Sequence, residues 1–239
     1  MKKKFLLTGI FAAMLLGGSY DAYADKVYTI YPVPQSQVAG EGSGAFTNEV
    51  NIVVENGIDE ATVSRLKSIL QSHAINATVT SAAKEGVTNV FMGINGSDGA
   101  ADKLASDWGM QREVFSKEGK YDRHSLMLKV ENGIASVLVL GEHTNATFFG
   151  LASLEQMLDG DKSAMPAVAI YDYADLRDRG IVEGYYGYPY SVSVKKDLMH
   201  FMMRHKMNTY LYGAKSDPYH SNYWKDDYPA TITAEQEKN

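Results

Sequence analysis

Two glycine-containing polar segments in the last third of this chain carry the residue types that could do chemistry. The first runs from Arg179 to Ser191 and reads RGIVEGYYGYPYS, an apolar strand entering a glycine-rich aromatic turn. The second runs from Met207 to His220 and reads MNTYLYGAKSDPYH, a strand followed by lysine, aspartate and histidine. Because both polar clusters directly follow their strands, they would lie on the carboxyl face of a (β/α)8 barrel, where such barrels carry their active sites.

Taken together, the two segments resemble the opening of the catalytic barrel of glycoside hydrolase family 84. These β-N-acetylglucosaminidases include the protein O-GlcNAc hydrolases and enzymes named hyaluronidases. The pattern resembled is Arg-Gly-x-x-Glu-Gly-Phe-Tyr-Gly-x-Pro-Trp-Ser, then Lys-Met-Asn-Thr-Tyr-x-Tyr-x-x-Lys-x-Asp-Pro-Tyr-His. The chain departs from it at Tyr185 and Tyr190, where phenylalanine and tryptophan are usual, and both changes keep an aromatic ring. The match covers residues 177–229.

The resemblance implies three sugar-binding residues, Gly184, Tyr186 and Lys215. Gly184 would offer its backbone carbonyl to a sugar hydroxyl, since glycine lets the chain approach a ligand closely. Tyr186 would line the acetamido pocket, and Lys215 would donate to sugar hydroxyls. The structural alternatives are a turn glycine, an aromatic ring packed at the barrel mouth, and a surface lysine. Asp217 and His220 are expected to shape the loop.

The resemblance also implies a mechanism in which the substrate supplies the nucleophile. Substrate-assisted families are an exception to the usual carboxylate nucleophile of retaining glycosidases. Two adjacent aspartates serve the step, one orienting the acetamido N–H and the other acting as general acid and then base; close placement separates their pKa values. The family's pair follows barrel strand four, so we expect it beyond Asn239, with no catalytic aspartate pair in this chain. Asp226-Asp227 matches the loop after strand two instead and is expected to be solvated.

The other titratable residues are expected to have structural roles. Their spacing predicts no cofactor or metal site. Strand alternation places Glu183 toward the barrel interior, where a buried carboxylate needs a partner such as Lys215 or Arg179. The histidines show no metal-ligand spacing, and His124 and His143 are expected at the surface or in loops.

The first 24 residues read as a secretory signal peptide. Residues 2–4 are lysines, residues 5–17 form an apolar run, and Ala22-Tyr23-Ala24 fits a small-x-small cleavage site before Asp25. A membrane-spanning helix needs about 20 apolar residues. We therefore expect a secreted or cell-surface protein with no stable membrane span after cleavage.

Composition limits the classes of partner. The chain has no cysteine, so a secreted form must be held by its core without disulfides. Its net charge of −6 becomes −8 once three lysines and Asp21 leave with the signal, and no basic tail is present, so nucleic acid is not an expected partner. Tyrosines are concentrated between Tyr171 and Tyr228. Aromatic rings stack on the apolar faces of sugars, although ordinary core packing uses them too.

Upstream of the motifs, the chain predicts an α+β domain over residues 25–174. Residues 27–35 read VYTIYPVPQ and are similar to the start of the small accessory domain, of the family 20b type, that precedes such barrels. Asn132-Gly133 between two apolar runs is a strong hairpin signal, because both turn residues need positive φ. Residues 25–47 are expected to begin with a short strand and become loop-like at 40–44. The predicted strands are 51–55, 77–80, 89–94, 125–130, 134–140 and 168–171, and the predicted helices are 59–73, 98–108 and 144–158.

Residues 175–239 are expected to form the first strands and helix of a (β/α)8 TIM barrel. The strands are predicted at 180–184 and 208–212, and a helix follows Ser191 or Ser193 and runs to about residue 206. Its predicted buried face consists of Leu198, Phe201, Met202 and His205. A barrel needs about 200 residues or more. We therefore expect the amino-terminal fragment of a longer enzyme, the alternative being a short protein completed by a partner chain.

The predicted function is that of a secreted glycosidase that removes terminal β-linked N-acetylglucosamine by substrate-assisted retaining catalysis. Its expected partners are glycans or glycoproteins that contain N-acetylglucosamine, with no cofactor. Two alternatives remain open from the sequence: a non-catalytic secreted glycan-binding protein and a non-functional fragment.

Overall fold

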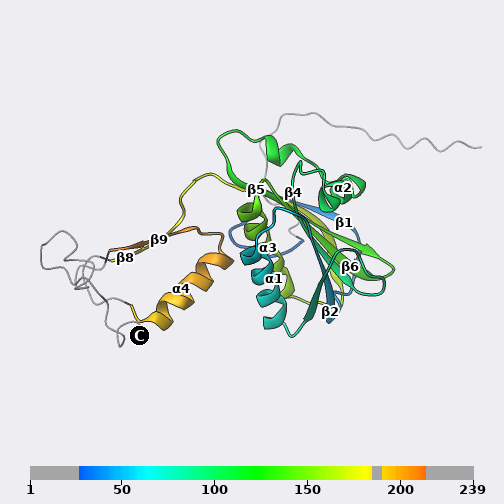
Figure 1. The fold of residues 1–239 in the computed structure, drawn as a ribbon, viewed down its shortest axis with the longest axis horizontal. Coiled ribbons are helices and arrows are strands. Elements are labelled where there is room, and N and C mark those ends of the chain that lie inside the picture. The colour runs from blue at the N-terminus through cyan, green and yellow to red at the C-terminus, as the bar shows by residue number, and fades with distance from the viewer. Residues whose placement is uncertain (1–26, 185–189, 214–239) are drawn as a thin grey trace, which may run out of the picture.

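The computed structural model describes residues 27–184 and 190–213, which form a seven-stranded sheet domain followed by a strand–helix–strand unit (Figure 1). The sheet has the order β1-β7-β5-β6-β4-β2-β3. Strands β2, β3, β4 and β6 run parallel, whereas β5, β7 and β1 add antiparallel pairs. The strands are β1 (Ser36–Gly44), β2 (Glu49–Val54), β3 (Asn76–Thr80), β4 (Thr88–Ile94), β5 (Tyr121–Glu131), β6 (Ile134–Gly141) and β7 (Met165–Ala174).

Helices cover both faces of this sheet. Those of the domain are α1 (Glu60–Ser72), α2 (Ala100–Asp107), the 3-10 helix η1 (Glu113–Ser116) and α3 (Thr144–Leu158). Alternation along β5 separates the two layers, because successive side chains of a strand point to opposite faces. Leu126 and Leu128 pack in the core formed with α1 and α3, whereas Met127 packs in the smaller core formed with α2 and η1. The predicted α+β domain is confirmed.

The predicted hairpin forms where the sequence placed it. Asn132 and Gly133, between β5 and β6, have φ angles of 51° and 75°. Two positive φ values match the twist of a tight hairpin, which explains the choice of Asn-Gly.

Three expectations about the first domain are wrong. No strand lies within residues 27–35, and the predicted loop at 40–44 belongs to β1. The glycines there allow close packing, since a Cβ on Gly40 would lie 2.8 Å from the Cβ of Ala167. His124, expected at the surface, is 2% exposed because β5 carries it between β7 and α3.

The second part of the described chain is a parallel strand–helix–strand unit. It consists of β8 (Gly180–Glu183), α4 (Val192–Arg204) and β9 (Thr209–Tyr212), with Gly180 opposite Thr209. Ser191 is the N-cap of α4 and accepts from the amide of Val194. The predicted order of an α+β domain followed by a parallel strand–helix–strand unit is thus confirmed, and the completed barrel remains a prediction.

The predicted buried face of α4 is only partly buried. Met202 is buried, but Phe201 is 47% exposed and stacks on the ring of His205, and Leu198 is half-buried. The reason is that α4 meets α3 near its carboxyl end and runs away from the domain along the rest of its length (Figure 1). Within the described ranges, no helix combines the length and apolar character needed to cross a membrane.

Candidate functional site

The carboxyl ends of β8 and β9 come together at one edge of the strand pair. Glu183 pairs with Tyr212 in the parallel register, so Gly184 and Gly213 leave the two strands side by side. In strand–helix barrels this edge carries the reacting groups. Gly184 is the predicted sugar-binding residue that the structure describes. Outside the described residues lie Tyr186, Lys215, Asp217, His220 and the pair Asp226-Asp227.

The two glycines that bracket β8 serve different purposes. A Cβ on Gly180 would lie 1.5 Å from the carbonyl oxygen of Thr209, so this glycine is required for the strands to pair. A Cβ on Gly184 would meet no described atom within 4 Å, and the residue is exposed. Packing in the described chain therefore gives no reason for glycine at position 184, whereas close approach of a ligand to its backbone does.

Glu183 lies buried beneath this edge, as strand alternation predicted, and of its two expected partners Lys215 lies outside the described residues. One carboxylate oxygen accepts from the backbone amide of Tyr190 at 2.7 Å, and the other accepts from the hydroxyl of Tyr210. The ammonium of Lys195 lies 3.7 Å away. Arg179, one of the two predicted partners, sits at the opposite end of β8 and pairs with Asp122 instead.

The contacts of Glu183 indicate a positioning role. Burial, together with the hydrogen bond to Glu183, raises the pKa of Tyr210 to about 12, so the phenol stays protonated and donates. Lys195 also lies over the ring of Tyr212, 4.3 Å from its centroid. The carboxylate thus ties the end of β8 to β9 and to the start of α4. Sequence reasoning missed Tyr210 and Lys195, because their role depends on a strand register that only the fold supplies.

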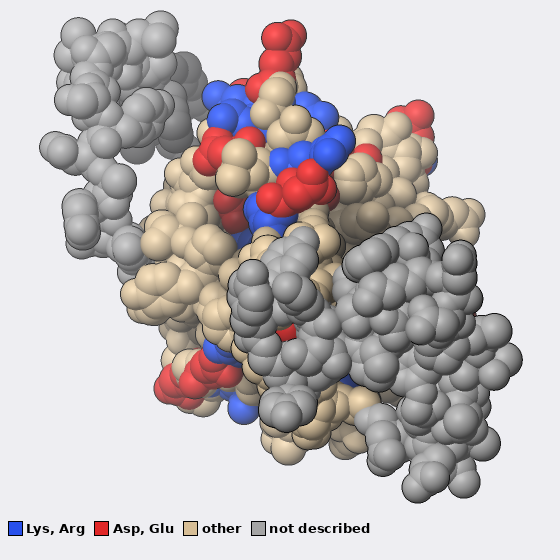
Figure 2. Space-filling model, turned by 90° about the vertical axis from the view of Figure 1, so that its left-hand side faces the viewer, with Lys and Arg blue, Asp and Glu red and all other residues tan. Residues whose placement is uncertain are grey.

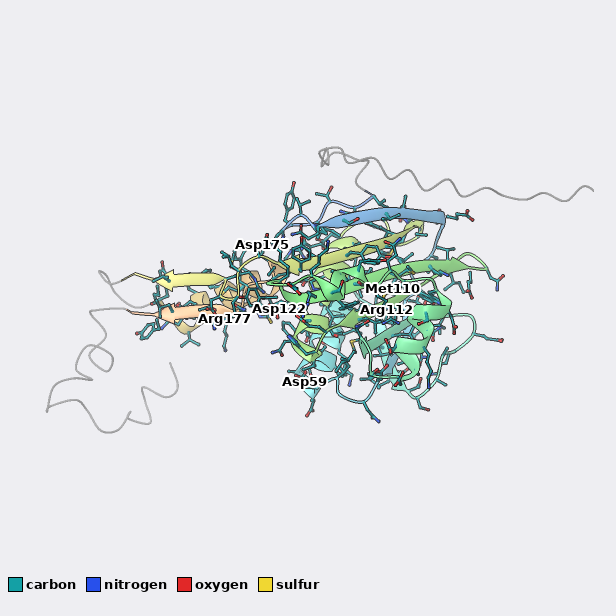
Figure 3. All side chains as sticks on the ribbon, turned by 90° about the horizontal axis from the view of Figure 1, so that it is seen from above. Asp59, Met110, Arg112, Asp122, Asp175 and Arg177 are labelled. Atoms are coloured by element: carbon teal, nitrogen blue, oxygen red, sulfur yellow. The ribbon has the colours of Figure 1, made fainter. Side chains whose placement is uncertain are left out.

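A cleft of about 350 Å³ lies at the other end of the unit, where the amino ends of β8 and β9 meet the domain. Its wall includes Phe149 and Tyr173. Charged side chains of its wall form ion pairs: Arg179 with Asp122, Lys206 with Asp172, and Asp175 with the neighbouring Lys120. Figure 3 shows Asp122, Asp175 and Arg177 gathered at this junction. Internally paired charges at the amino end of barrel strands indicate a structural joint, not the active site.

Surface charge and metal-ligating groups add little to the site. Acidic and basic side chains are interspersed on the face shown in Figure 2. Within residues 27–184 and 190–213, no group of three or more histidine, aspartate or glutamate side chains is arranged to hold a metal ion.

Family models match both parts of the chain. Residues 27–173 match glycosyl hydrolase family 20, domain 2, and residues 179–238 match the family described as β-N-acetylglucosaminidase. Among curated proteins, the chain is similar to protein O-GlcNAcase of Mus musculus, with 34% identity over 85 residues that make up 32% of this chain and 9% of the relative. Protein O-GlcNAcase of Rattus norvegicus is 39% identical over 49 residues, which are 20% of this chain and 5% of the relative.

Solved structures give the same assignment. CpGH84D is 37% identical with a TM-score of 0.74, over 87% of this chain and 34% of that one. A family 20 exo-β-N-acetylglucosaminidase from Vibrio harveyi, at 16% identity and a TM-score of 0.54 over 78% of this chain and 25% of its own, shares the fold alone. The chain spans about a third of the length of CpGH84D and less than a tenth of the curated relatives. Because residues 27–173 make up more than half of its length, the chain belongs to the family described as glycosyl hydrolase family 20, domain 2, and the segment after this domain is similar to β-N-acetylglucosaminidases and to CpGH84D.

Proposed function

We propose that this chain forms the amino-terminal part of an enzyme that hydrolyses terminal β-linked N-acetylglucosamine from glycans or glycoproteins. One observation carries the proposal: Gly184 lies exposed at the carboxyl end of two paired parallel strands, with no described atom within 4 Å of a Cβ placed on it, inside the segment that matches the β-N-acetylglucosaminidase family. Ligands of strand–helix barrels bind at that end. The family's activity and the geometry of the strand ends therefore point to the same place.

The proposed chemistry is retaining and substrate-assisted, and it requires no cofactor. The acetamido oxygen of the substrate attacks the anomeric carbon, as in other families without a carboxylate nucleophile. The Gly184 carbonyl accepts from a sugar hydroxyl, Tyr186 lines the acetamido pocket, and Lys215 donates to sugar hydroxyls. Two adjacent aspartates in a later part of a longer enzyme orient the acetamido group and supply the acid and base. Buried Glu183 holds the strand ends in register beneath the sugar.

The proposed location is outside the cell. The basic start and the apolar run of residues 5–17 support export through a signal peptide cleaved before Asp25. Sequencing the amino terminus of the protein recovered from culture medium tests this: a start at Asp25 supports export, and retention of Met1 in the cell contradicts it.

The activity is tested with a methylumbelliferyl β-N-acetylglucosaminide. The protein translated from the source gene past the codon for Asn239 is assayed beside the 239-residue chain. Release of fluorophore by the longer protein, with none from the matching β-glucoside that lacks the acetamido group, is the expected result. Absence of release by a folded longer protein contradicts the proposal. Saturable sugar binding without turnover in both proteins favours a non-catalytic glycan-binding protein instead.

A further inference from the structure

A lysine from the strand–helix–strand unit is buried inside the first domain. Lys206 follows α4, has a left-handed φ of 57°, and is 7% exposed. Its ammonium lies 2.5 Å from the carboxylate of Asp172, 2.9 Å from the hydroxyl of Ser153 and 3.4 Å from Nε2 of His124. The three partners come from β7, α3 and β5. A residue of the unit therefore reaches the interior that the other domain builds.

Such a buried cation is stable only when its partners are arranged for it. Removing a charge from water is costly unless opposite charge and hydrogen bonds replace the water. Nδ1 of His124 lies 2.7 Å from the carbonyl of Asp122 and donates to it, which leaves Nε2 as an acceptor that faces Lys206. Burial and the neighbouring lysine lower the pKa of His124 to about 4, so the ring is neutral at pH 7. The pocket is thus built to receive a cation.

A second cation joins the same boundary at the start of β8. The guanidinium of Arg179 lies 2.6 Å from the carboxylate of Asp122 and 5.3 Å from the ring centroid of Phe149. Its Nε donates to the carbonyl of Lys206 at 3.0 Å. Arg179 therefore connects the start of β8, the turn after α4 and the first domain.

Side chains of the first domain also cap the end of α4. The last carbonyls of a helix have no partner within the helix and must find one elsewhere. Arg65 of α1 donates to the carbonyl of Met203 at 3.1 Å, and Gln156 of α3 donates to the carbonyl of Arg204 at 3.1 Å. A cation at a helix carboxyl terminus also interacts favourably with the helix dipole.

We infer that the family 20-type domain is the platform on which the first strand–helix unit of the barrel is held, with Lys206 as the main positioning residue. Within the described chain the unit has little core of its own, since Val182, Leu211 and Phe201 are 59%, 53% and 47% exposed. A two-stranded sheet of this kind is marginal alone. The domain supplies the counter-charges and caps for its amino end, and thereby sets where Gly184 stands.

The test is native-state amide hydrogen exchange on the 239-residue chain carrying Lys206→Met, which keeps the length of the side chain and removes its charge. Exchange in β8, α4 and β9 is expected to quicken by at least about 100-fold, while the central strands β4 and β6 keep their protection. The matched control is Lys196→Met, the same change at an exposed position of α4, which should leave exchange unchanged. Unchanged protection of α4 in Lys206→Met would overturn the inference.

A double-mutant cycle keeps the test decisive if Lys206→Met destabilises the whole chain. Asp172→Asn and the combination of Asp172→Asn with Lys206→Met complete the cycle. The double variant is expected to exchange at α4 at least about tenfold more slowly than Lys206→Met alone, because it leaves no unpaired buried carboxylate. If the effects of Asp172→Asn and Lys206→Met on α4 exchange are additive in the double variant, Asp172 does not hold Lys206. That result would contradict the inference.

Discussion

The two ends of β8 and β9 are built in opposite ways. At the amino end, Arg179 and Lys206 are engaged by carboxylates of the first domain, and a Cβ on Gly180 has no room. At the carboxyl end, Gly184 is exposed, and a Cβ on it would meet no described atom within 4 Å. Barrel enzymes separate stability from function along their strands in this way, with stability at the amino face and chemistry at the carboxyl face. In the described strand pair the stabilising contacts lie at the amino end, and chemistry at the carboxyl end is part of the proposed function.

The largest expected effect comes from substituting alanine for Gly180, compared with the same substitution at Gly184. Gly180→Ala places a Cβ against the backbone of Thr209, which cannot rotate away, and should weaken β8–β9 pairing by about 3 kcal/mol or more. Gly184→Ala should change stability by less than about 0.5 kcal/mol. Hydrogen exchange of the β9 amides measures both, and equal effects of the two substitutions would remove the distinction between the ends.

Acid should loosen the amino end before it affects the carboxyl end. Because the pKa of His124 is about 4 in the folded chain and about 6.5 in an unfolded one, the unfolded state binds more protons between these values. The contribution of the neutral His124 ring to the free energy of unfolding is complete above pH 6.5. It is lost as the pH falls towards 4, by up to about 3 kcal/mol in total. Lys206, Asp172 and Asp122 are the charged groups around the ring.

Urea unfolding at several pH values, followed by exchange at α4, measures this loss. His124→Gln cannot titrate, so its stability should vary less between pH 6.5 and 4.5 than that of the unaltered chain. Parallel pH curves for the two proteins would show that the titrating group lies elsewhere.

Removing the charge of Glu183 should loosen the carboxyl end by a smaller amount. Glu183→Gln keeps an acceptor for the amide of Tyr190 but weakens the bond from Tyr210, at a cost of about 1–2 kcal/mol. The pKa of Tyr210 should fall from about 12 towards that of an exposed tyrosine. Tyrosine Cζ NMR titration follows it, with Tyr210→Phe assigning the signal; an unmoved pKa would mean that Glu183 does not hold the phenol.

The smallest effect concerns the start of α4. Ser191→Ala removes the N-cap acceptor for Val194 and should lower the stability of the helix by about 1 kcal/mol. Ser193→Ala is the matched control and should cost less, because the structure selects Ser191 from the two candidates. Exchange of the first-turn amides of α4 distinguishes them.

Local patterns predicted much of this fold, and long-range contacts account for what they missed. The Asn132-Gly133 hairpin and the α3 helix follow from short sequence signals. His124 was misplaced because its partner Lys206 lies 82 positions further along the chain. The helical spacing of apolar residues likewise predicted an apolar face of α4 that includes Phe201. Such spacing does not show which element would cover that face.

Some features of the candidate site also followed from the sequence, and others depended on the fold. Strand alternation correctly predicted that Glu183 is buried, but the identity of its partner Tyr210 depends on the β8–β9 register, and a place in a barrel interior stays a prediction. The motif led to Gly184 directly, and the structure added that no described atom lies within 4 Å of a Cβ placed there. The roles of Tyr186 and Lys215 stay predictions, since both lie outside the described residues.

The most direct test of the account is an NMR titration of the 239-residue chain with N-acetylglucosamine. Saturable shifts of the amides of Gly184, Tyr212 and Gly213 are expected, and they should be lost in Gly184→Val, while the amides around His124 and Arg179 stay unmoved. Shifts gathered at the cleft beside His124, Phe149 and Arg179 would contradict it, because the sugar would then bind at the amino end of the strands.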